Sequence, residues 1–278
     1  MARTPTQTRP KRPPKPAEQN ERRPAFEIVG GIQPRGMRTV IYGPGGVGKT
    51  ELASLLEDVD GPVLFLDLED GTDHLDVQRV RVTDWDTLRA VTADPEALTS
   101  YGAVVVDSLT KAEEHAAAWV VENVPHENGG SVSSVEGYGF GKGYTHVYQE
   151  FVALLNDLEQ MAKAGTNGVL ICHECVANVP NPTGADWIRY EPRLQSPASG
   201  KSSIRLRVKE WADHVLFVAF DTVVSSDGNA SGSGPRTIHP QERPGHLAKS
   251  RRLERPIAYR RGDAEVWRQL TDEGGDEE

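Results

Sequence analysis

The chain has 278 residues, with 37% hydrophobic and 26% charged side chains, a composition typical of a soluble globular protein with one large domain or two small ones. Two cysteines exclude a disulfide scaffold, and the apolar runs fall short of the ~18–20 residues that cross a bilayer, so we expect a cytoplasmic protein with no membrane partner. The formal net charge of −10 excludes a protein that coats duplex DNA by bulk electrostatics. Any contact with nucleic acid has to use local basic patches.

The two ends of the chain differ in charge from its middle. Residues 1–24 contain six prolines and seven Lys or Arg against Glu18 and Glu21, and residues 272–278 carry five Asp or Glu. Both segments have few large apolar side chains to bury, so we predict a disordered basic tail, one domain over residues 25–271 and a disordered acidic tail. The basic tail is either a solvated leader or a tether for nucleic acid or a protein partner.

Short apolar runs alternate with helical patterns along the middle of the chain. Strands are predicted at residues 38–42, 62–67, 79–82, 103–107, 168–173 and 214–220, and helices at residues 50–59, 111–123 and 144–163. Continuous apolar strands separated by amphipathic helices are typical of an α/β fold with a mainly parallel sheet and helices on both faces. Three segments interrupt this pattern and are expected to be long loops: residues 122–143, 178–203 and 225–235.

Residues 43–50, GPGGVGKT, match the phosphate-binding pattern G-x-x-x-x-G-K-[ST] in full, after an apolar strand and at the start of a helix. The glycines let backbone N–H groups turn toward phosphate oxygens, and the helix N-terminus adds positive potential. We therefore expect a nucleotide site with Lys49 on the β- and γ-phosphates and the Thr50 hydroxyl on Mg²⁺. The residues expected to contact the nucleotide are Gly43, Pro44, Gly45, Gly46, Val47, Gly48, Lys49, Thr50 and Glu51.

Acidic residues at two strand ends are candidates for the rest of the site. Asp107 ends the strand at 103–107 and is expected to hold the metal through water; the alternative is an Asp that caps the next helix. Asp67 and Glu69 lie two residues apart at the end of the strand at 62–67, so both point to the same side of an extended segment. Hydrolysis needs a group that orients water, and we expect Glu69 to be that group. The alternative is a solvated turn carboxylate.

The order of these motifs resembles the RecA-type ATPase core. GPGGVGKT is followed by LDLED, then by VVVDS, then by a strand that ends in a polar residue. The resemblance implies a three-layer RecA-like P-loop NTPase core with a late antiparallel strand extension, and ATP and Mg²⁺ as cofactors. It also implies the water-orienting role for Glu69 and nucleotide contacts for Asp107 and Ser108. At His173 it implies a γ-phosphate sensor that leads into a DNA-binding loop.

A late basic pair extends this resemblance. RecA-like recombinases carry a Lys-x-Lys pair in a late strand that reaches the ATP of the neighbouring subunit, and Lys249 and Arg251 have the same spacing. Two residues apart on an extended strand, they would project to one side. The resemblance implies a catalytic charge clamp between subunits, and the alternative is an ordinary basic surface strand.

More closely, residues 26–270 resemble the short RecA-core ATPases of phages, which are single-strand annealing or recombination proteins of a phage nucleotide-binding AAA-domain family. The shared features include LDLE, VVVDS, a YG loop before a long helix and a strand ending in His-Glu. The resemblance implies DNA-stimulated ATP hydrolysis, single-stranded DNA as a partner, and a homo-oligomeric ring or filament with nucleotide at the subunit interface. It places the protein in the host cytoplasm, with a single-strand-binding protein as a further partner. Glu51 departs from the pattern, since recombinases often have a second Thr or Ser there.

Two of the expected loops contain aromatic and basic side chains of the kind that stack on single-stranded bases and pair with phosphates. Three glutamates in the loop at 122–143 oppose DNA contact there, and the alternative for both loops is a solvated surface. The candidates are Tyr138, Phe140 and Lys142 in the first loop, and Trp187, Arg189, Arg193 and Lys201 in the second.

The stretch GVLICHEC at residues 168–175 places both cysteines around His173. A structural zinc site needs a fourth ligand that a second cysteine pair would supply, and redox C-x-x-C motifs start helices, so neither site is expected here. We expect Cys172 in the core and His173 directed at the γ-phosphate. Other classes stay open: a helicase-like or clock-type RecA-fold ATPase, a nucleotide switch without hydrolysis, and a P-loop small-molecule kinase.

Overall fold

The computed structural model describes residues 29–31, 33–221, 223–224, 230–231 and 235–272. The chain divides into two compact units, residues 1–33 and 34–278, and every helix and strand named below belongs to the second. The tail predicted at 1–24, all but the first residue of the tail predicted at 272–278, and most of the loop predicted at 225–235 lie outside the described residues.

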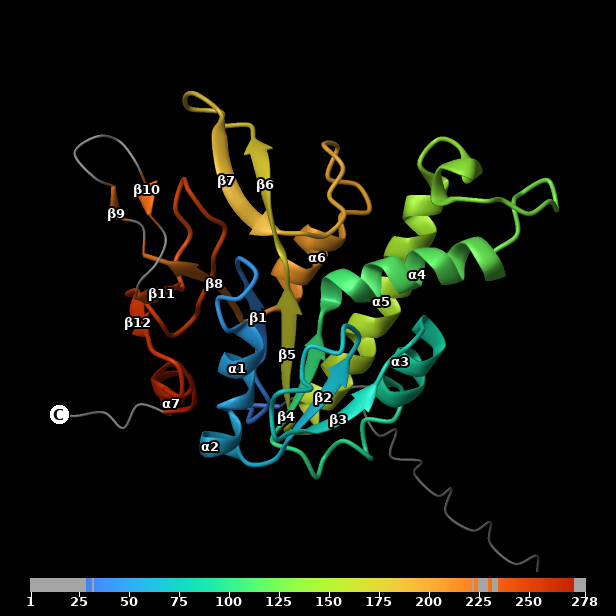
Figure 1. The fold of residues 1–278 in the computed structure, drawn as a ribbon. Helices are drawn as coiled ribbons and strands as arrows, with labels where there is room; N and C mark the ends of the chain where they lie inside the picture. Colours follow the sequence, from blue (N-terminus) through green and yellow to red (C-terminus); the bar gives the residue numbers. More distant parts are fainter. Residues whose placement is uncertain (1–28, 32, 222, 225–229, 232–234, 273–278) are drawn as a thin grey trace, which may run out of the picture. The chain divides into compact units, whose positions relative to one another are not determined.

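An eight-stranded sheet forms the centre of the second unit (Figure 1). Its order is β12-β11-β8-β1-β5-β4-β2-β3, in which the strands from β8 to β3 run parallel and β11 and β12 add an antiparallel extension. The predicted architecture is therefore confirmed: a mainly parallel α/β sheet with a late antiparallel extension. The strands are β1 (Arg38–Tyr42), β2 (Val63–Asp67), β3 (Gln78–Arg81), β4 (Ala103–Asp107), β5 (Asn167–Cys172), β8 (His214–Phe220), β11 (Arg236–His239) and β12 (Ile257–Tyr259).

Helices cover both faces of this sheet because alternate residues of a strand point to opposite sides. In β1, Val40 and Tyr42 belong to one apolar core and Ile41 to the other. The first core includes side chains of α3, α4, α5 and α6, and the second includes side chains of α1 and α7. The helices are α1 (Lys49–Ser54), α2 (Glu57–Asp60), α3 (Trp85–Thr92), α4 (Leu109–Asn123), α5 (Lys142–Lys163), α6 (Ile204–Trp211) and α7 (Glu265–Thr271).

The helix predicted at 50–59 is split into α1 and α2. The Ser54 hydroxyl donates to the carbonyl of Glu51 at 2.8 Å, a local bond that competes with the helical ladder. The end of α1 is also engaged from outside, because Trp267 of α7 is fully buried and its Nε1 donates to the Leu52 carbonyl at 2.6 Å. The C-terminal helix thus packs directly on the helix that follows the phosphate loop.

The prediction of one long loop at 178–203 is wrong. The segment Glu174–Val179 forms β6 and Trp187–Pro192 forms β7, and the two pair as an antiparallel hairpin that rises from the end of β5 (Figure 1). The alternation of exposed Ile188 and buried Arg189 marks a strand, but the prolines and glycine of the turn hid this pattern. The hairpin lies outside the main sheet, so packing against the core of that sheet does not determine its residue pattern.

The loop predicted at 122–143 is shorter than expected. Helix α4 runs to Asn123, a 3₁₀ helix, η1, covers Val135–Tyr138, and α5 already begins at Lys142. Two further short strands, β9 (Val223–Val224) and β10 (Ala230–Ser231), pair with each other late in the chain. None of the helices in the described ranges is long and apolar enough to cross a bilayer.

Candidate functional site

The candidate site lies where the central parallel strands end. The register aligns Tyr42 at the end of β1 with Cys172 of β5, and Asp107 at the end of β4 with both Ile171 of β5 and Asp67 of β2. The segments that follow these strands therefore leave the sheet at one edge. The phosphate loop follows β1, Ser108 follows β4, Glu69 follows β2, and His173 follows β5.

The phosphate loop is shaped by glycines in conformations that other residues adopt at a cost. Gly46 and Gly48 have φ angles of 74° and 93°, and Gly48 precedes the first residue of α1. Gly43 has a φ of 154°, and a Cβ at this position would lie 2.0 Å from the Val218 carbonyl oxygen of β8. Both backbone conformation and space therefore require glycine at position 43.

Lys49 is buried in the loop with its charge directed at backbone oxygens. Its Nζ donates to the carbonyls of Gly43 and Pro44 at 2.8 and 3.0 Å, and the residue is 8% exposed. Burial lowers the pKa of Lys49, while the negative charge of Asp107 acts in the opposite direction. A buried ammonium beside neutral carbonyls and a glycine cradle fits the charge and shape of a polyphosphate.

Thr50 and Asp107 form the part of the site that fits a divalent cation. The Thr50 hydroxyl donates to Asp107 Oδ2 at 2.7 Å, so two oxygen ligands lie side by side. Burial raises the pKa of Asp107 to about 6, and the charges of Glu69 and Asp67 add to this rise. A cation at this position favours the ionised carboxylate, which matches the residues to Mg²⁺.

Asp67 shapes the turn that carries Glu69. Its Oδ1 accepts from the backbone N–H groups of Glu69 and Gly71 at 3.2 and 3.1 Å. Its Oδ2 accepts from the Thr72 backbone N–H at 3.1 Å and from the Thr72 hydroxyl. Burial opposes ionisation, but these hydrogen bonds outweigh it and hold the pKa of Asp67 below its usual range. Asp67 is thus engaged by the turn itself, whereas the Glu69 carboxylate extends beyond the turn to residues of other strand ends.

The Glu69 carboxylate contacts residues that follow two other strands. Its Oε1 accepts from the Ser108 hydroxyl at 2.6 Å, and His173 Nε2 lies 3.0 Å from each of its carboxylate oxygens. Burial opposes ionisation of Glu69, but the bonds from Ser108 and His173 lower its pKa. The structure therefore brings together the residue expected to orient water, Glu69, the expected nucleotide contact Ser108 and the expected γ-phosphate sensor His173. It places His173 against Glu69, a contact the sequence did not predict.

A family model described as an AAA domain matches residues 35–252. The chain belongs to this AAA domain family. With the complete phosphate loop, membership makes the protein a P-loop ATPase. No protein with curated annotation matches the chain. Among solved structures, a KaiC-like protein from the hyperthermophilic archaeon Pyrococcus horikoshii OT3 is similar, with a TM-score of 0.43 and 14% identity over 82% of this chain and 87% of that chain.

Two residues beyond the family match, Tyr259 and Arg261, touch the phosphate loop or its helix and were not indicated by the sequence. The Tyr259 hydroxyl at the end of β12 donates to the Gly48 carbonyl at 3.3 Å. Arg261 Nε lies 3.1 Å from Glu51 Oε2. Glu51, the position that departs from the recombinase pattern, thus has an ion-pair partner from the C-terminal segment. A basic residue soon after the last strand is too common a feature to have indicated this contact.

Lys249 and Arg251 do not share a strand. Lys249 forms a single antiparallel bridge with Val215, and residues 251–252 form a bend, so the expectation of two side chains on one strand face is wrong. Lys249 Nζ donates to the carbonyls of Lys209 and Ala212 at 3.0 and 2.6 Å within its own chain. Arg251 is 60% exposed in its side chain, with its Nε 3.3 Å from Asp213 Oδ1. Of the pair, Arg251 is the residue with an accessible charge.

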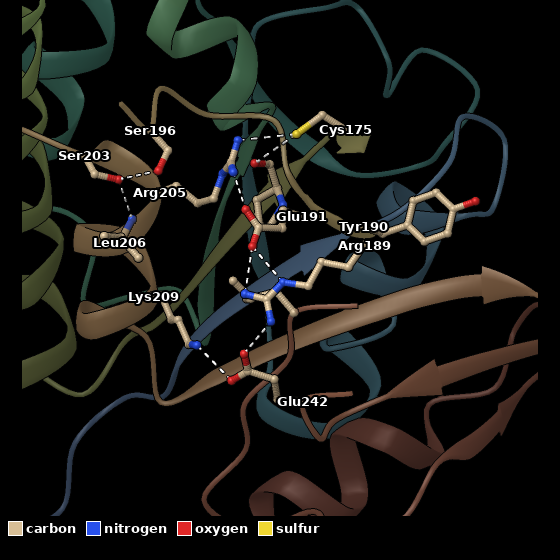
Figure 2. Close-up of polar contacts among 12 residues, drawn as sticks. Cys175, Arg189, Tyr190, Glu191, Ser196, Ser203, Arg205, Leu206, Lys209 and Glu242 are labelled. Carbon is tan, nitrogen blue, oxygen red and sulfur yellow. Dashed lines mark hydrogen bonds and ion pairs between the residues drawn. The ribbon is translucent and has the colours of Figure 1, made fainter. Parts of the chain in front are cut away.

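Two of the residues expected to contact DNA are buried in the AAA domain instead. Tyr138 is 4% exposed, and its hydroxyl donates to the carbonyls of Val120 and Val124, so it ties η1 to the end of α4. Arg189 is 7% exposed and is bound between Glu191 and Glu242 (Figure 2). Both expectations are wrong because the predicted loops fold into packed elements that consume these side chains.

The remaining DNA candidates stay exposed or partly exposed. Phe140 is fully exposed, and Arg193 and Lys201 also face solvent. Lys142 is paired with Glu127 at 2.6 Å, and the Arg189 guanidinium lies over the half-buried Trp187 ring at 5.8 Å from its centroid. Lys142 and Trp187 are therefore partly engaged by their own chain, whereas the side chains of Arg193 and Lys201 form no ion pair with any residue that the structure describes.

A pocket of about 480 Å³ lies between the start of α5 and the segment after β7. Phe140 and Tyr144 line it from the first side, and Gln195, Lys201 and Ser202 from the second. Gln195 Nε2 bridges the two sides, since it donates to the Ser202 carbonyl at 2.9 Å and to the Tyr144 carbonyl at 3.4 Å. The pocket therefore lies between two segments that are far apart in the sequence.

Gly43→Ala is expected to lower the free energy of unfolding and to abolish nucleotide binding, because its methyl group meets the Val218 carbonyl and its φ is unfavourable for alanine. The matched variant is Gly45→Ala, where a Cβ has no neighbouring atom within 4 Å. Chemical denaturation of both variants measures the difference. Equal stability of the two proteins would show that the tight approach of the loop to β8 is not a constraint.

Proposed function

We propose that this AAA domain binds and hydrolyses Mg-ATP, assembles as a homo-oligomer with nucleotide at the subunit interface, and binds single-stranded DNA in phage recombination or single-strand annealing. The proposal of hydrolysis rests on one observation: the Glu69 carboxylate is held by Ser108 and His173, at the same edge of the sheet as Thr50 and Asp107. Nucleotide binding alone needs no such carboxylate. Hydrolysis does, because an attacking water has to be oriented.

The residues of the chain divide the chemical task among them. Bound Mg-ATP supplies the phosphoanhydride and the cation that draws charge from its oxygens. Lys49 and the amides of the phosphate loop would bind the phosphates, the Thr50 hydroxyl would ligate the cation, and Asp107 would hold it through water. Glu69 accepts a hydrogen bond from water and aligns it, while Ser108 keeps the carboxylate in place.

The contact between His173 and Glu69 defines a resting arrangement. His173 Nε2 lies 3.0 Å from both carboxylate oxygens, which fixes the orientation of the carboxylate and leaves Glu69 Oε2 an acceptor site for water. His173 lies at the sheet edge that carries the phosphate loop. This position suits an imidazole that exchanges its contact with Glu69 for a contact with a phosphate oxygen. Hydrolysis would then depend on where the chain holds His173.

Glu69→Gln is expected to leave ATP affinity unchanged and to reduce kcat by at least about a hundredfold, because an amide is a poor acceptor for the proton of an attacking water. The neighbouring variant Asp70→Asn is the control, since Asp70 is exposed and paired only with Arg81 among the described residues. Binding is measured with a fluorescent nucleotide and turnover by phosphate release. Undiminished turnover in Glu69→Gln would remove it from this role, and transfer of phosphate to a small acceptor would favour a kinase.

The pocket beside α5 supports the proposal of a single-stranded DNA partner. It combines the aromatic rings of Phe140 and Tyr144 with the ammonium of Lys201 and the amide of Gln195. Aromatic rings stack on bases of any sequence, and a lysine pairs with the backbone phosphate. Arg193 lies exposed on the same segment as Gln195, which adds positive charge beside the pocket.

Phe140→Ala is expected to weaken single-stranded DNA binding by about 1–3 kcal/mol through the loss of one stacked base. Lys201→Ala is expected to lower the slope of log affinity against log salt by about 0.7, the value for one lost phosphate contact on a single strand. Lys163→Ala removes an exposed charge at the other end of α5 and is the control. Fluorescence anisotropy over a salt series measures all three. Equal binding by the three variants would place the DNA elsewhere.

The proposed oligomer requires a residue that one subunit lends to the next, and Arg251 is the accessible member of the late basic pair. Arg251→Ala and Lys49→Ala are each expected to be inactive alone. When the two are mixed, hydrolysis should return, because an intact phosphate loop can meet an intact Arg251 across an interface. Phosphate release and light scattering measure activity and assembly. A mixture as inactive as its components, in assemblies of unchanged size, would argue against a role between subunits.

A further inference from the structure

The first turn of α4 holds the point where the β6–β7 hairpin leaves the sheet. Thr110 is 4% exposed, and its hydroxyl accepts from the backbone N–H of His173 at 3.0 Å and donates to the carbonyl of Arg193 at 3.2 Å. The Arg193 backbone N–H donates in turn to the His173 carbonyl at 2.9 Å. These three bonds close a ring around the residue before β6 and the residue after β7.

One helical turn later, Glu113 holds the next residues of the same segment. Both of its carboxylate oxygens accept from the backbone N–H of Gln195, at 2.9 and 3.1 Å. Thr110 and Glu113 lie three residues apart and so share one face of α4. Burial raises the pKa of Glu113 to about 7, although the Gln195 N–H and the charges of Arg205 and Arg193 favour its ionised form. Within the described part of the chain, this carboxylate offsets its burial chiefly through the bond to Gln195.

The contacts of Thr110 and Glu113 connect the sheet edge that carries the phosphate loop with the pocket beside α5. Toward the nucleotide, Ser108 caps α4 through the Lys111 N–H and also donates to Glu69, and the His173 ring meets the same carboxylate. Toward the pocket, Gln195 donates to the carbonyls of Tyr144 and Ser202. Helix α4 begins at Leu109, directly after its N-cap Ser108, so the cap and the first two turns touch both ends of this path.

The hairpin between these contacts is stiffened by buried charges (Figure 2). Glu191 of β7 is 5% exposed and binds Arg189 of the same strand and Arg205 of α6. Arg189 also binds Glu242, which in turn binds Lys209 of α6. A strand fixed by the two buried ion pairs of Glu191 moves with its neighbours rather than bending alone. A ligand that displaces the segment after β7 therefore acts on His173 through the hydrogen bonds that Thr110 makes to both segments.

We propose that Thr110 and Glu113 are positioning residues for Glu69: they set the place of His173 against this carboxylate and transmit to it the position of the hairpin and the pocket. The inference rests on the proposed function, since it takes Glu69 as the water-orienting group. For binding, such coupling is reciprocal: if DNA in the pocket changes the affinity of the loop for nucleotide, nucleotide changes the affinity of the pocket for DNA by the same factor.

Thr110→Val removes both hydrogen bonds of the hydroxyl at nearly constant shape. It is expected to lower kcat by about tenfold, the rate equivalent of one or two hydrogen bonds, and to leave the affinity for ATP unchanged. Thr110→Ser keeps the hydroxyl and should restore most of the lost kcat. Unchanged kcat in Thr110→Val, a parallel loss of ATP affinity, or failure of serine to restore the rate would each overturn the proposal.

Glu113→Gln tests the second contact and also serves if Thr110→Val does not fold. It should reduce the stimulation of hydrolysis by a single-stranded oligonucleotide, whereas Glu114→Gln, at the adjacent exposed residue that pairs with Lys111, should not. Equal stimulation in the two glutamine variants would contradict the proposal.

A double-mutant cycle identifies His173 as the route. In a His173→Gln background, Thr110→Val should cost much less than it does alone, because both changes disturb one contact. If the two substitutions instead lowered kcat by independent factors that multiply, Thr110 would act by a route that does not include His173. The outcome for Glu69→Gln separates the two levels: if it retains turnover, the proposed function fails, and if it loses turnover while Thr110→Val does not, only this inference fails.

Discussion

The parallel register of β1, β5, β4 and β2 is the constraint on which the site depends. It brings the ends of strands that lie up to one hundred and thirty residues apart in the chain to one edge, with Asp107 facing both Ile171 and Asp67. Nothing in the local sequence around Glu69 calls for a partner, yet the register delivers Ser108 from β4 and His173 from β5 to its two oxygens. The same edge receives Lys49, because the phosphate loop follows β1.

Two carboxylates on this edge are placed in opposite electrostatic environments. Asp107 is buried beside other acids, which raises its pKa to about 6, whereas hydrogen bonds from Ser108 and His173 lower the pKa of Glu69. A nearby cation would favour the ionised form of Asp107, and the hydrogen bonds favour the ionised form of Glu69. The roles that we propose for the two residues, as a cation ligand and as a water-orienting base, fit these surroundings.

Much of the core architecture was predictable because its signals are local. The strands at 38–42 and 103–107 are continuous apolar runs, and the phosphate loop is a contiguous motif. The β6–β7 hairpin was missed because its alternation of Ile188 and Arg189 puts an apolar residue in solvent and a charge inside, the reverse of the usual pattern. Tyr138 and Arg189 looked like loop residues suited to DNA, and only their packing partners show that they are structural.

The sequence by itself determined the fold class, the phosphate loop and the residues at the strand ends, because periodicity and contiguous motifs act over a few residues. Tertiary structure alone decided that His173 contacts Glu69, that Arg261 pairs with Glu51, and that α4 ties the base of the hairpin through Thr110 and Glu113. These contacts join segments distant in the chain, and their partners are set by the register of the sheet and the direction of each helix. No spacing rule within one segment encodes that information.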